Sequence, residues 1–148
     1  MMSFDAMSDP TVSAWADALE PRGDAQLYLQ HQVGVAGVVA VAERAMPKLI
    51  EVDGIVLVES QYDPDTFEDW RRTLGEDRAA LARAVNHFVV WDELEAEGER
   101  DDHSDDMAAG FIAECWRARA AAEFPDRNIV VEVVDQYGPT VVMYEPNA

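Results

Sequence analysis

The stretch NIVVEVVDQYGPTVVMYEP, residues 128–146, decides the fold class. Two valine-rich runs flank a Gly-Pro dipeptide, and β-branched residues on both sides of a turn signal are typical of an antiparallel hairpin. A second pair of apolar runs, in KLIEVDGIVLVE, flanks Asp53-Gly54, a dipeptide that supplies the positive φ angles of a type I′ turn. We therefore expect hairpins near 48–59 and 128–145. A single strand with a glycine bulge is the alternative for the first of them.

Helical patterns surround these hairpins. Asp9-Pro10 and Asp63-Pro64 each offer an N-cap followed by proline at the first helical position. Further helices are expected from Asp24 to about residue 46, from Asp77 to about residue 94, and from about residue 105 to 123. In the helix that follows Asp24, the stripe expected to face the core is Leu27, His31, Val35, Val38, Ala42 and Ala45.

The order of these elements predicts one α+β domain over residues 1–148. About five helices would pack on a small mixed or antiparallel sheet of three or four strands. A chain of 148 residues with 49% hydrophobic residues has enough apolar material for one core. No internal repeat or linker divides it.

The cysteine count and the apolar runs bear on location. Cys115 is the single cysteine, so no internal disulfide can form, which fits a reducing compartment. The N-terminus has no basic segment leading into an apolar run, and the longest apolar stretch, 33–42, is shorter than the ~20 residues of a membrane helix. We expect a cytoplasmic protein without a membrane segment.

Charge restricts the classes of partner. Thirty acidic residues against eleven basic ones give a formal net charge of −19, and binding to a nucleic-acid backbone requires Lys and Arg. Nucleic acid is therefore disfavoured. The charge would attract a basic protein partner, or it would only keep the chain soluble. A saline habitat would give the same acidic bias without any partner, so both interpretations remain open.

The densest acidic segment is residues 92–106, in which nine of fifteen residues are Asp or Glu and Arg100 is the only base. Like charges repel, so a mobile loop is expected. A metal site at Asp101, His103, Asp105 and Asp106 has suitable donor atoms but no apolar support for them. The favoured interpretation is a solvated loop in which Asp102 or Ser104 caps the following helix. No metal or other cofactor is predicted.

Candidate catalytic residues are few. His31 lies on the apolar stripe, where the simpler prediction is a buried, neutral, structural histidine. Asn86 and His87 are adjacent, and the simpler prediction is that both are exposed; they would line a cleft only if the second hairpin or a neighbouring chain covered them. Cys115 lies on a helix face meant for the core and is expected to be inert. Asp63, Asp65, Glu68 and Asp69 lie in the first turns of an expected helix, where negative charge interacts favourably with the helix dipole, so they need not be catalytic. No phosphate loop, dinucleotide motif, nucleophile elbow or His-Glu-x-x-His motif is present.

These features favour a non-enzymatic acidic interaction protein that binds a more basic protein, as inhibitors, antitoxins and immunity proteins do. The first alternative is a small metal-assisted or acid–base enzyme that uses His31 or His87 with a carboxylate. The second is a homo-oligomeric scaffold whose acidity is purely solvating. Tyr62, Trp70 and Tyr137 are further aromatic candidates for an interface. The predicted partner-binding residues are Trp91, Glu95, Glu97, Asp101 and Asp102.

Overall fold

The structure, a computed structural model, describes residues 2–148. Its helices are α1 (Pro10–Asp17), α2 (Ala25–Tyr28), α3 (Gly34–Ala45), α4 (Pro64–Leu74), α5 (Arg78–Val85), α6 (Val90–Glu93) and α7 (Asp102–Glu123). Short turns of other helix types are η1 (Ala6–Ser8), the π-helical η2 (Leu29–Val33) and η3 (Glu59–Gln61). The strands are β1 (Leu49–Val52), β2 (Ile55–Val58), β3 (His87–Val89), β4 (Val130–Asp135) and β5 (Pro139–Tyr144).

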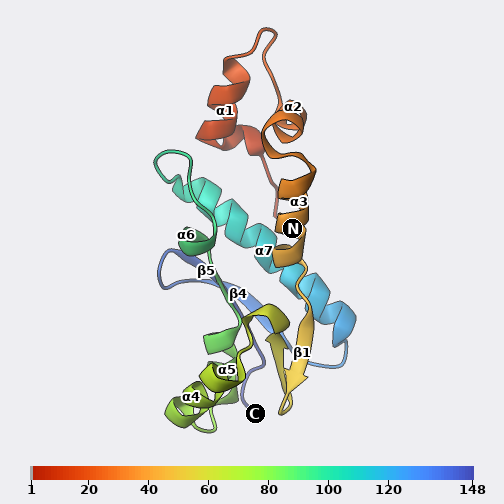
Figure 1. The fold of residues 1–148 in the computed structure, drawn as a ribbon, viewed down its shortest axis with the longest axis vertical. Coiled ribbons are helices and arrows are strands. Elements are labelled where there is room, and N and C mark those ends of the chain that lie inside the picture. The colour runs from red at the N-terminus through yellow and green to blue at the C-terminus, as the bar shows by residue number, and fades with distance from the viewer. Residues whose placement is uncertain (1) are drawn as a thin grey trace.

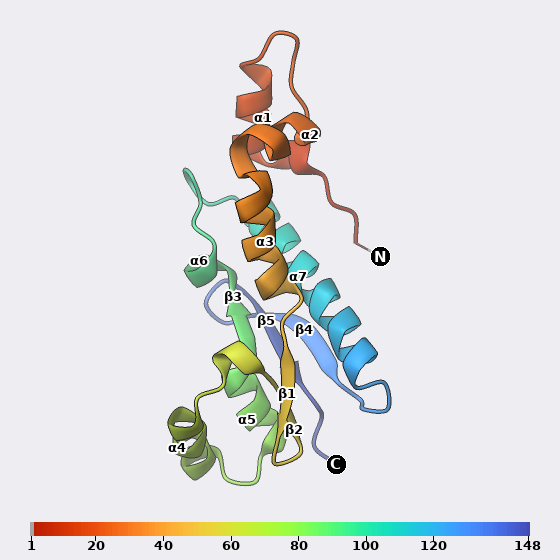
Figure 2. The same ribbon diagram turned by 45° about the vertical axis from the view of Figure 1, so that its right-hand side comes forward.

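The α+β class is confirmed. Figure 1 shows an elongated molecule with α1 and α2 at one end, α4 and α5 near the other, and α7 running obliquely between them. Figure 2, turned by 45°, shows α7 alongside the sheet that contains β4 and β5. In residues 2–148, no helix combines the length and the apolar character that crossing a membrane requires.

Both predicted hairpins are present. β1 and β2 pair antiparallel, with Val52 opposite Ile55, and the turn residues Asp53 and Gly54 have φ of 52° and 79°. These are the positive φ values that the type I′ interpretation requires. β4 and β5 form the second hairpin, with Val131 opposite Met143. The two hairpins belong to different sheets.

β2 separates two cores. All four of its residues are buried, and successive side chains of a strand point to opposite sides. Val56 and Val58 join the core that α7 forms with the three-stranded sheet. Ile55 and Leu57 join the second core, which α4 and α5 complete. A strand buried on both sides places α4 and α5 on one side of the molecule and α7 on the other.

The side chain of Asn86 links the two sheets. Its Oδ1 accepts from the Val58 N–H at 2.8 Å, and its Nδ2 donates to the carbonyls of Val56 and Met143 at 2.9 and 3.2 Å. Val56 and Val58 belong to β2, whereas Met143 belongs to β5. Asn86 is 0% exposed, so these bonds satisfy an amide that would otherwise be costly to bury.

The prediction of one helix from Asp77 to Leu94 is wrong. The helix ends at Val85, Asn86 turns the chain, and β3 then pairs with β5, with Phe88 opposite Val141. Strand pairing overrides local helical periodicity here, because Phe88 enters the core from an extended segment, followed by Val90 at the start of α6. α6 follows as a single short turn. The β3-β5-β4 sheet is therefore one strand larger than its hairpin, and the expected single sheet is in fact two.

The prediction that the stripe of the second helix faces the core is also wrong. Asp24 does begin a helical stretch, since its side chain accepts from the Leu27 N–H at 2.9 Å. The stretch is interrupted by η2, and of the six stripe residues only Ala45 is buried. His31, expected to be buried, is exposed. The extra residue of a π-turn rotates the later turns, and the side of α3 that meets α7 carries Val41, Arg44 and Ala45.

α7 begins three residues earlier than expected. Asp101 caps it, since its Oδ2 accepts from the N–H of Ser104 at 3.0 Å. The predicted loop of 92–106 is accordingly shorter: α6 takes its first residues and α7 its last, leaving residues 94–101 as the connection. The cap is Asp101 rather than Asp102 or Ser104.

We predict that Asn86→Asp lowers the free energy of unfolding by about 3 to 5 kcal/mol at pH 7, because a buried carboxylate would face the carbonyls of Val56 and Met143. Urea unfolding followed by circular dichroism measures this. Asn128→Asp makes the same charge change at an exposed position and should change stability by no more than about 0.5 kcal/mol. Equal effects of the two substitutions would contradict the role given to Asn86.

Candidate functional site

An acidic cleft lies where the 94–101 connection faces α1 and the start of α7. It is a hollow of about 270 Å³, and Tyr28, Arg100 and Ser104 also line it. We use the name acidic cleft for the hollow defined by the carboxylates of Asp9, Glu95, Glu97, Glu99, Asp101 and Asp105. Three of the predicted partner-binding residues, Glu95, Glu97 and Asp101, are therefore brought together.

Ser104 fastens one wall of the cleft. Its hydroxyl lies 2.6 Å from Asp9 Oδ2 and 2.9 Å from Asp101 Oδ2. A serine hydroxyl has one proton, so it donates to only one of the two carboxylates at a time. Asp9 also caps α1, with Oδ1 accepting from Thr11 and Val12. The cleft thus holds more acceptors than donors, which favours a positively charged donor from outside.

Asp105 and Arg100 close the other wall. The Arg100 guanidinium donates to both oxygens of Asp105 at 3.0 Å and to the Leu94 carbonyl at 2.9 Å. Trp91 Nε1 donates to Asp105 Oδ2 at 3.1 Å. Among the described residues that line the cleft, Arg100 is the only Lys or Arg, and its guanidinium is already engaged by Asp105 and the Leu94 carbonyl. Asp105, 7% exposed, holds the connection in place.

The remaining carboxylates are unneutralised. Among residues 2–148, no ion pair or side-chain hydrogen bond engages the carboxylates of Glu95, Glu97 or Glu99. Partial burial, and then the negative charges of Glu97 and Asp9, raise the pKa of the Tyr28 phenol above its ordinary value. The pKa of a phenol rises where negative charge opposes its ionisation. The cleft is therefore a region of negative potential.

An apolar groove adjoins the acidic cleft. It has a volume of about 530 Å³ and lies between α3, α6 and α7. The buried side chains of Phe88 and Ile112 form part of its wall. Leu94 and Ala108 line both the groove and the cleft. Arg44 stands at the groove, paired with Glu93 at 2.6 Å. We use the name apolar groove for the hollow lined by Ala40, Val41, Arg44, Phe88, Glu93, Leu94, Ala108, Phe111 and Ile112.

The other two predicted partner-binding residues, Trp91 and Asp102, line a neighbouring hollow of about 520 Å³ next to β4 and β5. Trp91 is 40% exposed, and its ring lies 5.3 Å from that of Tyr137. A Cβ at Gly138 would come within 2.4 Å of the Trp91 ring, so only glycine fits there. Trp91 is thus held firmly, with one edge reaching Asp105 of the acidic cleft.

The proposed metal ligands do not converge. Asp101 caps α7, Asp105 binds Arg100, and His103 is exposed on the first turn of α7. In the part of the chain that the structure describes, no group of three or more His, Cys, Asp or Glu side chains is placed to hold a metal ion.

The candidate catalytic residues lie in separate environments and do not form one catalytic group. His31 is exposed, with its ring 6.3 Å from that of Trp15. The three hydrogen bonds of the Asn86 amide all join backbone groups, which gives it a structural role. His87 is half-buried in a hollow with Asp63. Burial raises the pKa of the Cys115 thiol, which is the opposite of what a reactive cysteine requires.

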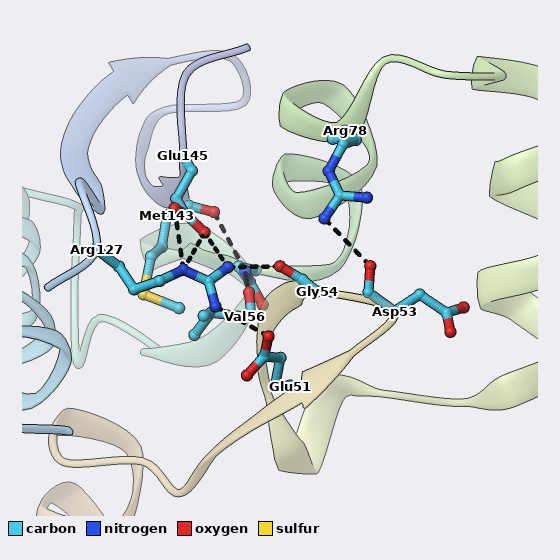
Figure 3. Close-up of polar contacts among 9 residues, drawn as sticks. Glu51, Asp53, Gly54, Val56, Arg78, Arg127, Met143 and Glu145 are labelled. Carbon is cyan, nitrogen blue, oxygen red and sulfur yellow. Dashed lines mark hydrogen bonds and ion pairs between the residues drawn. The ribbon is translucent and has the colours of Figure 1, made fainter. Parts of the chain in front are cut away.

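A further hollow, of about 230 Å³, lies beside the β1–β2 turn and the last residues of the chain. Figure 3 shows Arg127 directed at Glu145, Glu51 and the carbonyl of Gly54, while Arg78 donates to the carbonyl of Asp53. These bonds fasten the turn to the C-terminal segment. The Arg127 guanidinium is occupied by its own chain, so this hollow is structural in character.

Comparison with protein-family models, with curated proteins and with solved structures finds no match. The site therefore has to be interpreted from its own geometry. Two parts of the site do not follow from the sequence: Asp9, where the local pattern predicts only a helix cap, and the apolar groove, which depends on how α3 and α7 pack. In the sequence, valines at 35, 38, 39 and 41 point to more than one side of a helix, which is the signal that the helix has more than one apolar side.

We predict that Asp105→Asn destabilises the protein by about 2 to 3 kcal/mol, because the amide carries no charge to pair with Arg100 and its NH2 group cannot replace the oxygen that accepts from Arg100 Nη2. Urea unfolding and tryptophan fluorescence measure the change. Asp106→Asn is the matched control, since Asp106 is the next residue and is exposed. If both variants unfold at the same urea concentration, Asp105 does not hold the connection.

Proposed function

We propose that the protein is a non-enzymatic interaction protein that binds a more basic protein at the acidic cleft. The observation that carries this proposal is that the acidic cleft and the apolar groove share Leu94 and Ala108. One partner segment with a basic side and an apolar side would fill both. Binding of this kind is the chemistry of inhibitors, antitoxins and immunity-type proteins.

The electrostatics support a basic partner. The net charge of −19 would steer a cationic protein from a distance. At the cleft, Glu95, Glu97 and Glu99 are free to accept from Lys or Arg, and they give up no internal ion pair in doing so. Because exposed ion pairs contribute little affinity, the apolar groove would supply most of the lifetime of the complex.

The acid–base enzyme alternative retains one position. His87 and Asp63 line the same hollow of about 370 Å³, and within residues 2–148 Gln61 Oε1 is buried there with no hydrogen-bond partner. However, Asp63 accepts from both the N–H and the hydroxyl of Thr66, which lowers its pKa. A carboxylate occupied as a helix cap is poorly placed to orient a catalytic histidine, so the interaction function is favoured.

Capture from the native lysate at ~0.01 M and ~0.15 M salt tests the proposal, because the Debye length falls from ~30 Å to ~8 Å between them. A basic protein should be recovered at low salt. The triple variant Glu95→Gln, Glu97→Gln, Glu99→Gln should bind it with an association rate reduced by about tenfold. The control, Glu20→Gln, Glu59→Gln, Glu76→Gln, removes the same number of charges at exposed positions elsewhere. The proposal fails if no basic partner is recovered, or if the two triple variants bind equally fast.

The groove should govern dissociation. Leu94→Gln places a polar amide between the cleft and the groove, and we expect the partner to dissociate about tenfold faster while the association rate stays near wild type. Surface plasmon resonance separates the two rates. Leu19→Gln is the control, since Leu19 has the same 37% exposure as Leu94 and lies outside both hollows. Equal dissociation rates for these two variants would remove the groove from the binding site.

A further inference from the structure

One side of α3 is apolar and exposed along its length. Val35, Val38, Val39 and Ala42 recur at i, i+3, i+4 and i+7, so they share one face of the helix. Val35 is 82% exposed, Val39 63% and Val38 48%. Figures 1 and 2 both show α3 on the outside of the molecule, next to α7. We use the name valine strip for Val35, Val38, Val39 and Ala42.

The side of α3 away from the valine strip is already in use: Val41 lines the apolar groove, and the Arg44 carbonyl accepts from Trp116 Nε1 at 3.0 Å. Ala45 continues the row of Val38 and Ala42, but there, at the end of α3, the core that α7 forms buries it. A helix that is apolar on all sides is normally enclosed on all sides. In a single chain α3 is covered on one side only, which leaves the valine strip in water.

The charge pattern indicates what covers the strip. Residues 25–42 contain no Asp, Glu, Lys or Arg, in a chain that has thirty acidic and eleven basic residues. A basic partner would find no carboxylate to pair with here, whereas the acidic cleft offers several. An uncharged surface of this kind is where two copies of a strongly acidic chain can touch without burying unpaired carboxylates.

We infer that a second copy of this chain covers the valine strip, with α3 packing against α3 of the other copy across a two-fold axis. A two-fold interface brings the same patch of both copies together. The spacing of 35, 38 and 42 alternates three and four residues, which is the repeat of a helix pair whose side chains interlock. The strip is thus complementary to itself. This interface lies on the side of α3 opposite the apolar groove and leaves the acidic cleft open.

The size of the strip sets the strength of the dimer. The four residues are a small part of the roughly 20 to 30 residues, or about 800 Å², that each partner contributes to a standard interface. Leu29 before the strip and Met46 after it are also exposed and would extend the contact. A dimer that depends on concentration is expected. Repulsion between two copies of charge −19 should weaken it at low salt.

Sedimentation equilibrium of the full chain tests the inference. Between about 5 and about 500 µM protein, the mass should rise from 16.5 kDa toward twice that value, and more readily at ~0.15 M than at ~0.01 M salt. Val39→Lys should weaken the dimer by about tenfold or more, since a symmetric pair loses the buried valine twice. Val133→Lys makes the same change at an exposed valine of β4 and should leave the dimer intact.

Cysteine cross-linking locates the contact. In a Cys115→Ala background, Val39→Cys should form a disulfide-linked dimer under mild oxidation, because a disulfide requires Cβ atoms about 4 Å apart. Val133→Cys in the same background should remain monomeric. Circular dichroism establishes that each variant is folded.

Three results would overturn the inference: a monomer at every concentration, equal weakening by the two lysine substitutions, or equal cross-linking of the two cysteine variants. The salt response separates this inference from the proposed function. Self-association should strengthen as salt rises, whereas capture of a basic partner should weaken, so one can fail while the other stands.

Discussion

The hydrogen bonds of the Asn86 side chain hold two separate sheets in one structure. With its oxygen on β2 and its nitrogen on β2 and β5, the amide fixes the distance between the two hairpins. It also stands where α5 ends and β3 begins, so the same residue that joins the sheets turns the chain. Everything after this turn, including α6, the 94–101 connection and the start of α7, depends on it for position. The position of the acidic cleft therefore depends on the buried amide of Asn86, about ten residues before the 94–101 connection in the chain.

Local chemistry in the sequence was sufficient for the elements whose ends are determined locally. The Asp53-Gly54 turn and the caps at Asp9, Asp24 and Asp63 form as expected, because a positive φ or a capping carboxylate is a property of a few neighbouring residues. β3 could not be predicted in this way. Three residues that fit a helical period equally well become a strand only because β5 offers a free edge to pair with. Asn86 itself has the appearance of an ordinary polar helix residue.

The candidate site likewise contains residues whose grouping follows from the local sequence and residues that only tertiary packing brings in. Glu95, Glu97 and Asp101 are close in the sequence, so their grouping could be anticipated from the density of charge. Asp9 lies 92 residues before Asp101 in the sequence and reaches the cleft through its contact with the Ser104 hydroxyl. No local pattern in the sequence predicts that contact. The error over His31 has a similar cause. The stripe of the second helix is apolar as expected, but which side of α3 meets α7 is decided by packing at Trp116 and Ala45.

The placement of the arginines explains why unpaired carboxylates gather at the acidic cleft although the whole chain is acidic. Several arginines are consumed in fastening one segment to another: Arg44 to Glu93, Arg71 to Asp53, Arg100 to Asp105, and Arg127 to Glu51 and Glu145. Each pair removes one carboxylate from the surface potential and fixes a loop or turn.

The carboxylates of the acidic cleft then fall into two groups. Those that cap or pair, such as Asp101 and Asp105, stabilise the fold and are already satisfied by their own chain. Those of Glu95, Glu97 and Glu99 repel one another and, within residues 2–148, form no ion pair or side-chain hydrogen bond. Since repulsion between exposed like charges costs folding free energy, these three side chains make the fold less stable than neutral ones would. Cationic side chains would relieve this repulsion at neutral pH, and a basic protein would bring them together with an apolar side chain that the neighbouring groove can enclose.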